Sequence, residues 1–208
     1  MIKNFIFDFG GVILDIDMPK VFRGFATLGV GAEAMGIGTG TLAANSPVLQ
    51  LFSQYQCGFI STDEFCSIIA SKCKPGTTKE QVAETWLTVC VDLPQHRLDA
   101  IQELRKNHKV YLLSNINDLH WDYCCEKWFN RGGHNCEEYF DKLFLSQRMG
   151  MEKPNPEIFK KVIADTGIVP EETMFLDDTL ENLESAAKLG FLTFHAAPGV
   201  DWIKEFVG

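Results

Sequence analysis

The segment IKNFIFDFGGV, residues 2–12, decides the fold class of this chain. Its apolar run Ile2–Phe7 leads into an acid, Asp8, and then into the pair Gly10-Gly11. A continuous apolar run, rather than an alternating one, suits a strand that is covered on both faces of a parallel sheet. We therefore predict a buried first strand with a carboxylate at its carboxyl end, beside glycines that leave backbone amides open.

Four further apolar runs of the same kind follow, and helical patterns lie between most of them. The predicted strands are Val110–Leu113, Lys142–Leu145, Thr173–Leu176 and Phe191–Phe194. The predicted helices are Leu98–Asn107, Pro156–Thr166 and Leu180–Leu189. This alternation predicts an α/β fold with a doubly wound, Rossmann-like parallel sheet.

The stretch from Met18 to Pro94 interrupts the alternation. It predicts four helices and no clear strand: Pro19–Leu28, Ser46–Gln56, and two that open with capping boxes, at Ser61 with Glu64 and at Thr77 with Glu80. An insert directly after the first strand would sit over the carboxyl ends of the sheet, where open α/β folds bind ligands. We predict an α/β core domain of residues 1–17 and 95–208 and a helical cap domain of residues 18–94.

Composition excludes several classes of protein. The 208 residues include 19 Lys and Arg against 28 Asp and Glu, a net charge of −9, which argues against a nucleic-acid partner. No apolar run reaches the roughly 20 residues that span a bilayer, so we expect no membrane partner. Seven cysteines without a Cys-x-x-Cys pair suit buried thiols in a reducing, cytoplasmic compartment. No heptad seam is present, and we expect a monomer.

Polar residues follow the predicted strands where each strand ends. Asp8 could act as a nucleophile beside bound phosphate. The pair Ser114-Asn115 could hold phosphoryl oxygens, and Lys153, in a proline-bounded loop, could neutralise a transferring phosphoryl group. The adjacent acids Asp177-Asp178, with Asn182 nearby, are costly unless a cation sits there, and oxygen ligands suit Mg²⁺.

Each of these signals has a plain structural explanation: a turn, a loop start, a solvated lysine or a helix cap. The four together fall at four consecutive strand ends in one order: nucleophile, hydroxyl, lysine, acid pair. Chance agreement of position, order and residue type is small.

This set resembles the haloacid dehalogenase-like hydrolase superfamily, over nearly the whole chain. The motifs that carry the resemblance are Phe7–Val12, Leu112–Asn115, Lys153-Pro154 and Phe175–Asp178 with Asn182. Two further stretches, Asp15–Asp17 and Ser146–Gly150, look like the α-D-glucose-1-phosphate phosphatase branch of that superfamily.

The resemblance implies a Mg²⁺-dependent phosphatase of small phosphorylated metabolites, with sugar phosphates preferred. Asp8 would attack phosphorus and form an aspartyl-phosphate that water hydrolyses. Mg²⁺ would be held by Asp8, the Gly10 carbonyl and Asp178, with Asp177 and Asn182 behind these ligands. Phosphate would be bound by Phe9, Gly10, Gly11, Ser114, Asn115 and Lys153. The implied sheet order, in strand numbers along the chain, is 5-4-1-2-3.

One departure from the family pattern concerns acid–base catalysis. Most phosphatases of this superfamily carry a second Asp two residues after the nucleophile, where this chain has Gly10. General acid–base catalysis contributes on the order of 10²–10⁴-fold. The leaving group could need little protonation, as an anomeric sugar oxygen does. Alternatively, Asp15 or Asp17 could substitute, or the protein could be catalytically weak; we favour the first explanation.

Two other functions fit the same fold. A 2-haloacid dehalogenase releases halide, which needs no protonation, but an aspartate performs that reaction without a metal. A non-catalytic member would bind a phosphorylated ligand or a protein partner. Asp8 and Lys153 speak against such a member, and Gly10 speaks faintly for it.

Overall fold

The computed structural model describes residues 1–30, 47–131 and 135–208. Five strands form one parallel sheet in the order β5-β4-β1-β6-β7. The strands are β1 (Asn4–Phe7), β4 (Lys109–Ser114), β5 (Lys142–Leu145), β6 (Thr173–Asp177) and β7 (Leu192–His195). The predicted order 5-4-1-2-3 is confirmed, with β1 in the centre and each expected strand found within two residues of its predicted start.

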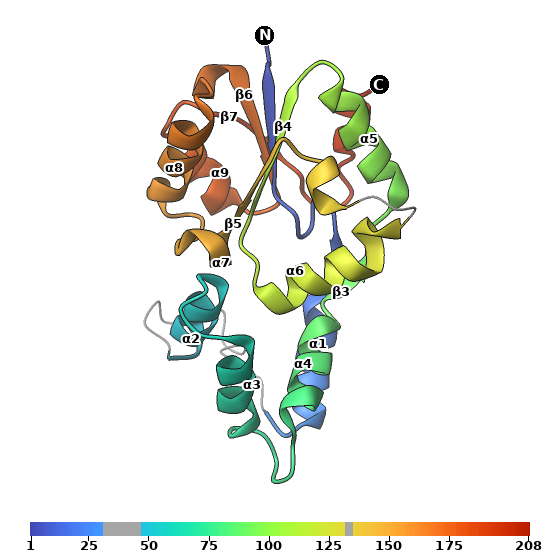
Figure 1. Cartoon of the computed structure of the whole chain (residues 1–208), viewed down its shortest axis with the longest axis vertical. Helices are drawn as coiled ribbons and strands as arrows, with labels where there is room; N and C mark the ends of the chain where they lie inside the picture. Colours follow the sequence, from blue (N-terminus) through green and yellow to red (C-terminus); the bar gives the residue numbers. More distant parts are fainter. Residues whose placement is uncertain (31–46, 132–134) are drawn as a thin grey trace.

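Helices cover both faces of the sheet, as the unbroken apolar runs predict (Figure 1). Phe5 and Phe7 of β1 pack into the cluster that contains α5, while Ile6 points to the opposite face and packs with α8 and α9. The helices of this part are α5 (Gln95–Arg105), α6 (Asp118–Cys124), α7 (Ser146–Met149), α8 (Pro156–Thr166), α9 (Leu180–Ala187) and α10 (Trp202–Phe206). A π-helical segment, Cys125–Phe129, continues α6, and two short 3-10 turns lie at Cys136–Glu138 and Pro170–Glu172.

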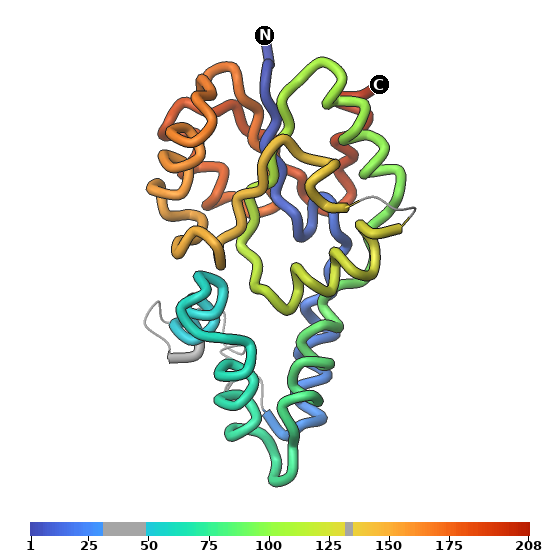
Figure 2. Tube along the Cα trace, in the orientation of Figure 1, coloured from blue at the N-terminus to red at the C-terminus, as the bar shows by residue number. Residues whose placement is uncertain are grey.

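Helices of the segment 18–94, called the helical insert below, lie together beyond the carboxyl ends of the strands (Figure 1). They are α1 (Met18–Thr27), α2 (Pro47–Gln56), α3 (Thr62–Ala70) and α4 (Lys79–Leu87). The expected start of the second helix at residue 46 lies outside the described residues. The chain leaves the sheet toward α1 and returns from α4 along neighbouring paths (Figure 2). Phe25, Phe65 and Trp86 of the insert belong to the same apolar cluster as β1.

Two details of the insert differ from prediction. A strand is present: β3 (Cys90–Asp92) pairs antiparallel with β2 (Asp15–Ile16) to form a short ribbon where the insert meets the sheet. Three residues are too few to show a strand pattern in the sequence, and β3 is a strand because it pairs with β2 in the folded protein. Thr78 with Gln81, and not Thr77 with Glu80, forms the capping box of α4. The hydroxyl of Thr77 donates instead to the Lys74 carbonyl.

The capping box at Ser61 and Glu64 is confirmed at the start of α3. All seven cysteines are free thiols. Within the described ranges, no helix combines the length and the apolar character needed to cross a membrane.

Candidate active site at the carboxyl edge of the sheet

The central strand places Asp8 between the ends of its two neighbours. Phe7 is in register with Leu112 of β4 and with Leu176 of β6, and the Asp8 amide donates to the Leu176 carbonyl at 2.8 Å. Because all five strands are parallel, the residues that follow them meet at one edge. Asp8, Ser114 and Asp177 are therefore brought together, as the sequence predicts.

Lys153 reaches this edge and is buried there, with 3% of its surface exposed. Its ammonium nitrogen lies 2.7 Å from Asp8 Oδ1 and 2.7 Å from Asp177 Oδ2, and it donates to the Leu113 carbonyl at 2.9 Å. An ammonium group has three protons to donate, and all three have acceptors here. The simple alternative of a solvated lysine is therefore wrong.

The backbone of Lys153 is held by the side chain of Asn115. Asn115 Nδ2 donates to the Lys153 carbonyl at 2.8 Å, and the Lys153 amide donates to Asn115 Oδ1 at 2.9 Å. One residue further on, the Ser185 hydroxyl donates to the Pro154 carbonyl at 2.6 Å. The reciprocal pair from Asn115 fixes where the lysine side chain begins.

Asp177 is fully buried and its carboxylate accepts hydrogen bonds on both oxygens. Besides Lys153, its donors are the Thr179 amide at 2.8 Å and Asn182 Nδ2, which lies 3.0 and 3.1 Å from the two oxygens. These bonds join the end of β6 to the first turn of α9. They leave Asp177 poorly placed to give an oxygen to a cation.

Three carboxylates gather at the edge. One oxygen from each of Asp8, Asp177 and Asp178 lies within 4.8 Å of the others. Asp177 is occupied by its donors, whereas the Gly10 carbonyl accepts no hydrogen bond in the described part of the chain. Two carboxylates and a free carbonyl offer the hard oxygen ligands that Mg²⁺ prefers, so these residues fit that cation.

Burial and neighbouring charges set the protonation of the cluster. Burial raises the pKa of Asp8 to about 7, although the nearby Lys153 ammonium lowers it, and the Asp177 carboxylate adds to the rise. The pKa of Asp178 is raised too, by burial first and then by Asp177. Burial alone would lower the pKa of Lys153, but Asp8 and Asp177 raise it. A cation between the acids would favour their charged forms.

Ser114, like Asp8, lies where the sequence places it. It is 2% exposed, and its hydroxyl has no hydrogen-bond partner among the described residues. The hydroxyl is thus available to a bound oxyanion.

The structure limits which atoms of Phe9 and Gly11 could contact a phosphate. The Phe9 ring is buried in the apolar core, packed near Trp121 and Phe129, so only its backbone can serve a ligand. The Gly11 amide already donates to the Leu14 carbonyl at 2.8 Å. Gly11 instead makes room: a Cβ atom there would lie 2.3 Å from Asp178 Oδ2.

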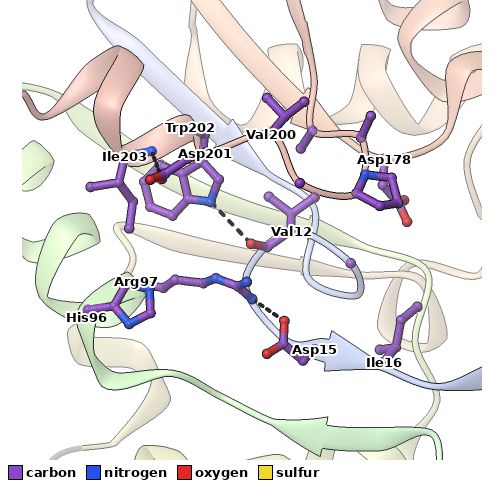
Figure 3. Close-up of a pocket in the computed structure, with 15 residues that line it drawn as sticks. Val12, Asp15, Ile16, His96, Arg97, Asp178, Val200, Asp201, Trp202 and Ile203 are labelled. Atoms are coloured by element: carbon purple, nitrogen blue, oxygen red, sulfur yellow. Dashed lines mark hydrogen bonds and ion pairs between the residues drawn. The ribbon is translucent and has the colours of Figure 1, made fainter.

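Asp15 and Asp17, the nearest substitutes for the missing acid, both have structural partners. Asp15 Oδ1 accepts from Arg97 at 2.8 Å, at the wall of a cavity of about 560 Å³ that also includes Asp178 (Figure 3). Asp17 accepts from the Lys20 amide at 2.8 Å and caps α1. Gly10 is not needed for space, since a Cβ atom there would come no closer than 3.6 Å to the Ile16 side chain.

Several site residues were not predicted from sequence. The side-chain role of Asn115 was missed, although the residue lies in a predicted motif. Thr179 directly follows the acid pair, and this position was the available sign that its amide could donate to Asp177. No pattern marks Ser185, because its contact with the Pro154 carbonyl spans 31 residues.

Comparisons with known proteins show the family of this chain. The family model described as haloacid dehalogenase-like hydrolase matches residues 2–190. A D-ribitol-5-phosphate phosphatase from Bacteroides thetaiotaomicron is 38% identical over 205 residues, which are 99% of this chain and 97% of that protein.

Solved structures give the same result. One is an enzyme of the haloacid dehalogenase (HAD) family from Bacteroides thetaiotaomicron, solved in complex with magnesium and inorganic phosphate. Its TM-score is 0.87 at 35% identity, and the match covers 99% of this chain and 100% of that chain. A predicted HAD-like family hydrolase from Porphyromonas gingivalis has a TM-score of 0.86 at 31% identity, over 100% of this chain and 97% of its own. The chain belongs to the haloacid dehalogenase-like hydrolase family.

Proposed function

We propose that this enzyme is a Mg²⁺-dependent phosphatase of small phosphorylated molecules, with sugar or sugar-alcohol phosphates as substrates. The observation that carries the proposal is the Lys153 ammonium, shared at 2.7 Å between Asp8 and Asp177, beside the carboxylate of Asp178. The similarity to a D-ribitol-5-phosphate phosphatase supports it. The family model, the similar phosphatase and the similar solved structures do not single out the glucose-1-phosphate phosphatase branch.

In the proposed reaction, an Asp8 oxygen attacks phosphorus and the bond from phosphorus to the ester oxygen breaks. The ester oxygen leaves with the bonding electron pair and takes a proton from solvent water to become the alcohol. A further water molecule then hydrolyses the aspartyl-phosphate to inorganic phosphate and the free carboxylate. The Lys153 ammonium neutralises charge on the phosphoryl oxygens as it develops. The unpartnered Ser114 hydroxyl and the Asn115 backbone amide donate to the same oxygens.

The proposed cation ligands are Asp8, the Gly10 carbonyl and Asp178. When bound there, Mg²⁺ would supply positive charge that orients the phosphoryl group and stabilises it during transfer. Asp177 and Asn182 keep indirect roles: Asp177 accepts from the Lys153 ammonium, and Asn182, in the first turn of α9, donates to Asp177. Gly11 allows Asp178 to approach the turn after β1.

The missing acid at Gly10 bears on the substrate. Asp15 and Asp17 are held by Arg97 and by α1, which weakens them as substitutes. An anomeric leaving oxygen would need little protonation, but ribitol, the sugar alcohol of the similar phosphatase, has no anomeric carbon. We therefore propose a substrate panel that contains both kinds of phosphate ester.

We also propose that residues 1–17 and 95–208 form the core domain and 18–94 a cap domain over the site. The placement of α1–α4 beyond the strand ends supports this division. We propose that the enzyme acts as a monomer, since one chain supplies Asp8, Lys153, Asp177 and Asp178.

The test is phosphate release with Mg²⁺ and with EDTA. D-ribitol 5-phosphate, α-D-glucose 1-phosphate and p-nitrophenyl phosphate are compared, with Asp8→Asn as the blank. We expect Mg²⁺-dependent release that falls by roughly 10³-fold or more in Asp8→Asn, because the nucleophile is lost. Full activity in that variant would contradict the aspartyl-phosphate mechanism.

The same preparation tests the other functions. Halide release from a 2-haloacid in EDTA, without phosphate release, would indicate a dehalogenase. Binding of phosphate esters without turnover of any compound would indicate a non-catalytic member.

A further inference from the structure

The carboxyl end of α2 contacts α7, a helix of the sheet part of the molecule (Figure 1). The Ser146 hydroxyl donates to the Gln56 carbonyl at 2.6 Å. Gly58, two residues further along, has φ +72°, and a Cβ atom there would lie 2.2 Å from the Gln147 carbonyl oxygen. The two backbones therefore meet at a distance that only glycine permits.

One side-chain bond extends this contact to the loop that carries the lysine, residues 150–155, called the Lys153 loop below. The Ser53 hydroxyl of α2 donates to Glu152 Oε1 at 2.5 Å, and the pair is partly buried. Among the described residues, it is the one side-chain hydrogen bond that joins the helical insert to this loop. A short bond to a carboxylate is among the stronger hydrogen bonds in proteins.

Among the described residues, the other hydrogen bonds that hold the Lys153 loop come from the sheet part or from the loop itself. Asn115, after β4, holds the Lys153 backbone, and Ser185 of α9 holds the Pro154 carbonyl. The Asn155 amide donates to the Glu152 carbonyl at 3.1 Å within the loop. Glu152, which directly precedes Lys153 in the chain, is thus the residue through which α2 contacts this loop by a side-chain hydrogen bond.

We infer that Glu152 is a positioning residue. Its hydrogen bond with Ser53 couples the position of α2 to the position of the Lys153 ammonium beside Asp8. The inference rests on the proposed role of Lys153 in phosphoryl transfer. That ammonium must satisfy two carboxylates and a carbonyl at once, and only 3% of the Lys153 surface is exposed. Small displacements of such a group have large effects on rate, so α2 controls whether the site is assembled.

The test uses Ser53→Ala, Glu152→Ala and Glu152→Gln in the full-length protein. The Gln oxygen still accepts from the Ser53 hydroxyl, so this variant serves as the conservative rescue. Ser67→Ala is the matched control for the serine, because among the described residues its hydroxyl bonds only within α3, to the Asp63 carbonyl. Glu157→Ala is the control for the acid, because that exposed side chain has Lys160 as its one charged partner in the described part of the chain.

Two readouts are measured for each variant. Hydrogen exchange by mass spectrometry follows peptides that cover α2 and the Lys153 loop. Turnover of p-nitrophenyl phosphate with Mg²⁺ gives kcat and KM. We expect Ser53→Ala and Glu152→Ala to speed exchange in both segments and to lower kcat about tenfold with little change in KM. Glu152→Gln and the two controls should stay within about twofold of wild type.

Faster exchange in α2 alone, with kcat unchanged, would overturn the inference and leave a bond that only stabilises the insert. Failure of the proposed function has a different signature, because wild type would then release no phosphate that depends on Asp8. The exchange arm does not need turnover. Coupled exchange in both segments would still support the link between α2 and the loop, and uncoupled exchange would still overturn it.

Discussion

At the scale of single residues, the site is organised by one buried cation between two carboxylates. Lys153, Asp8 and Asp177 are each less than 10% exposed, so water screens their charges only weakly. Removing one partner from such a group leaves an uncompensated buried charge, which costs about 3–5 kcal/mol. The lysine therefore stabilises the folded site as well as serving the proposed chemistry.

Replacement of Gly11 should distort the proposed cation site without removing any of its ligands. Its φ is +79°, and a Cβ atom would lie 2.3 Å from Asp178 Oδ2. We expect Gly11→Ala to displace Asp178 and to weaken Mg²⁺ affinity by roughly tenfold or more, with a loss of stability of about 1–3 kcal/mol.

Isothermal titration with Mg²⁺ and urea unfolding measure both effects. Gly76→Ala is the matched control, because the φ of Gly76 is also positive, at +87°, and no atom lies within 4 Å of the new methyl group. Equal Mg²⁺ affinity in the two variants would contradict this explanation.

At the scale of secondary-structure elements, α6 links the sheet part to the insert through His120. Its Nε2 lies 3.1 Å from the Trp86 carbonyl at the end of α4, and its Nδ1 lies 3.2 Å from Asn117 Nδ2. A neutral ring that donates from Nε2 and accepts at Nδ1 satisfies both partners. Burial lowers the pKa of His120 to about 4, so the folded protein holds the ring neutral.

This gives a prediction for stability against pH. The unfolded chain binds a proton near the ordinary value of 6.5, while the folded chain binds it only near 4. The contribution is therefore fully present above pH 6.5 and is lost as the pH falls toward 4. We expect His120 to lower the free energy of unfolding by about 2 kcal/mol between pH 7 and pH 5.

Urea unfolding at the two pH values, for wild type and His120→Gln, isolates this effect from other titrating groups. The variant should lose about 2 kcal/mol less than wild type over the same interval. Identical losses would show that His120 is not protonated on unfolding in this range.

At the scale of the whole molecule, β1 and β6 bring distant acids into one cluster, which should couple cation binding to folding. The unfolded chain cannot hold Asp8 and Asp178 together, so Mg²⁺ stabilises only the folded state. With Mg²⁺ at ten or more times its Kd, we expect the thermal midpoint to rise by roughly 3–5 °C.

Scanning calorimetry in Mg²⁺ and in EDTA measures the shift. Asp178→Asn should abolish it, whereas Asp15→Asn should keep it, because Asp15 pairs with Arg97 outside the cluster. A shift that persists in Asp178→Asn would place the cation elsewhere.

Much of this protein was predictable from its sequence. Buried strands leave long apolar runs, and their parallel arrangement puts the following residues at one edge. For this reason Asp8, Ser114, Lys153 and the acid pair could be named before the structure, along with the sheet order implied by the family resemblance. The capping box at Ser61 was equally readable, because it depends on residues three apart.

Only the tertiary structure decided how these residues are partnered. The clamp of Asn115 on Lys153 and the bond from Ser53 to Glu152 join residues 38 and 99 positions apart. The ribbon of β2 and β3 and the occupied Gly11 amide likewise depend on packing. Local sequence patterns record which face of an element is buried, whereas hydrogen bonds between distant segments depend on where the packed elements place each atom.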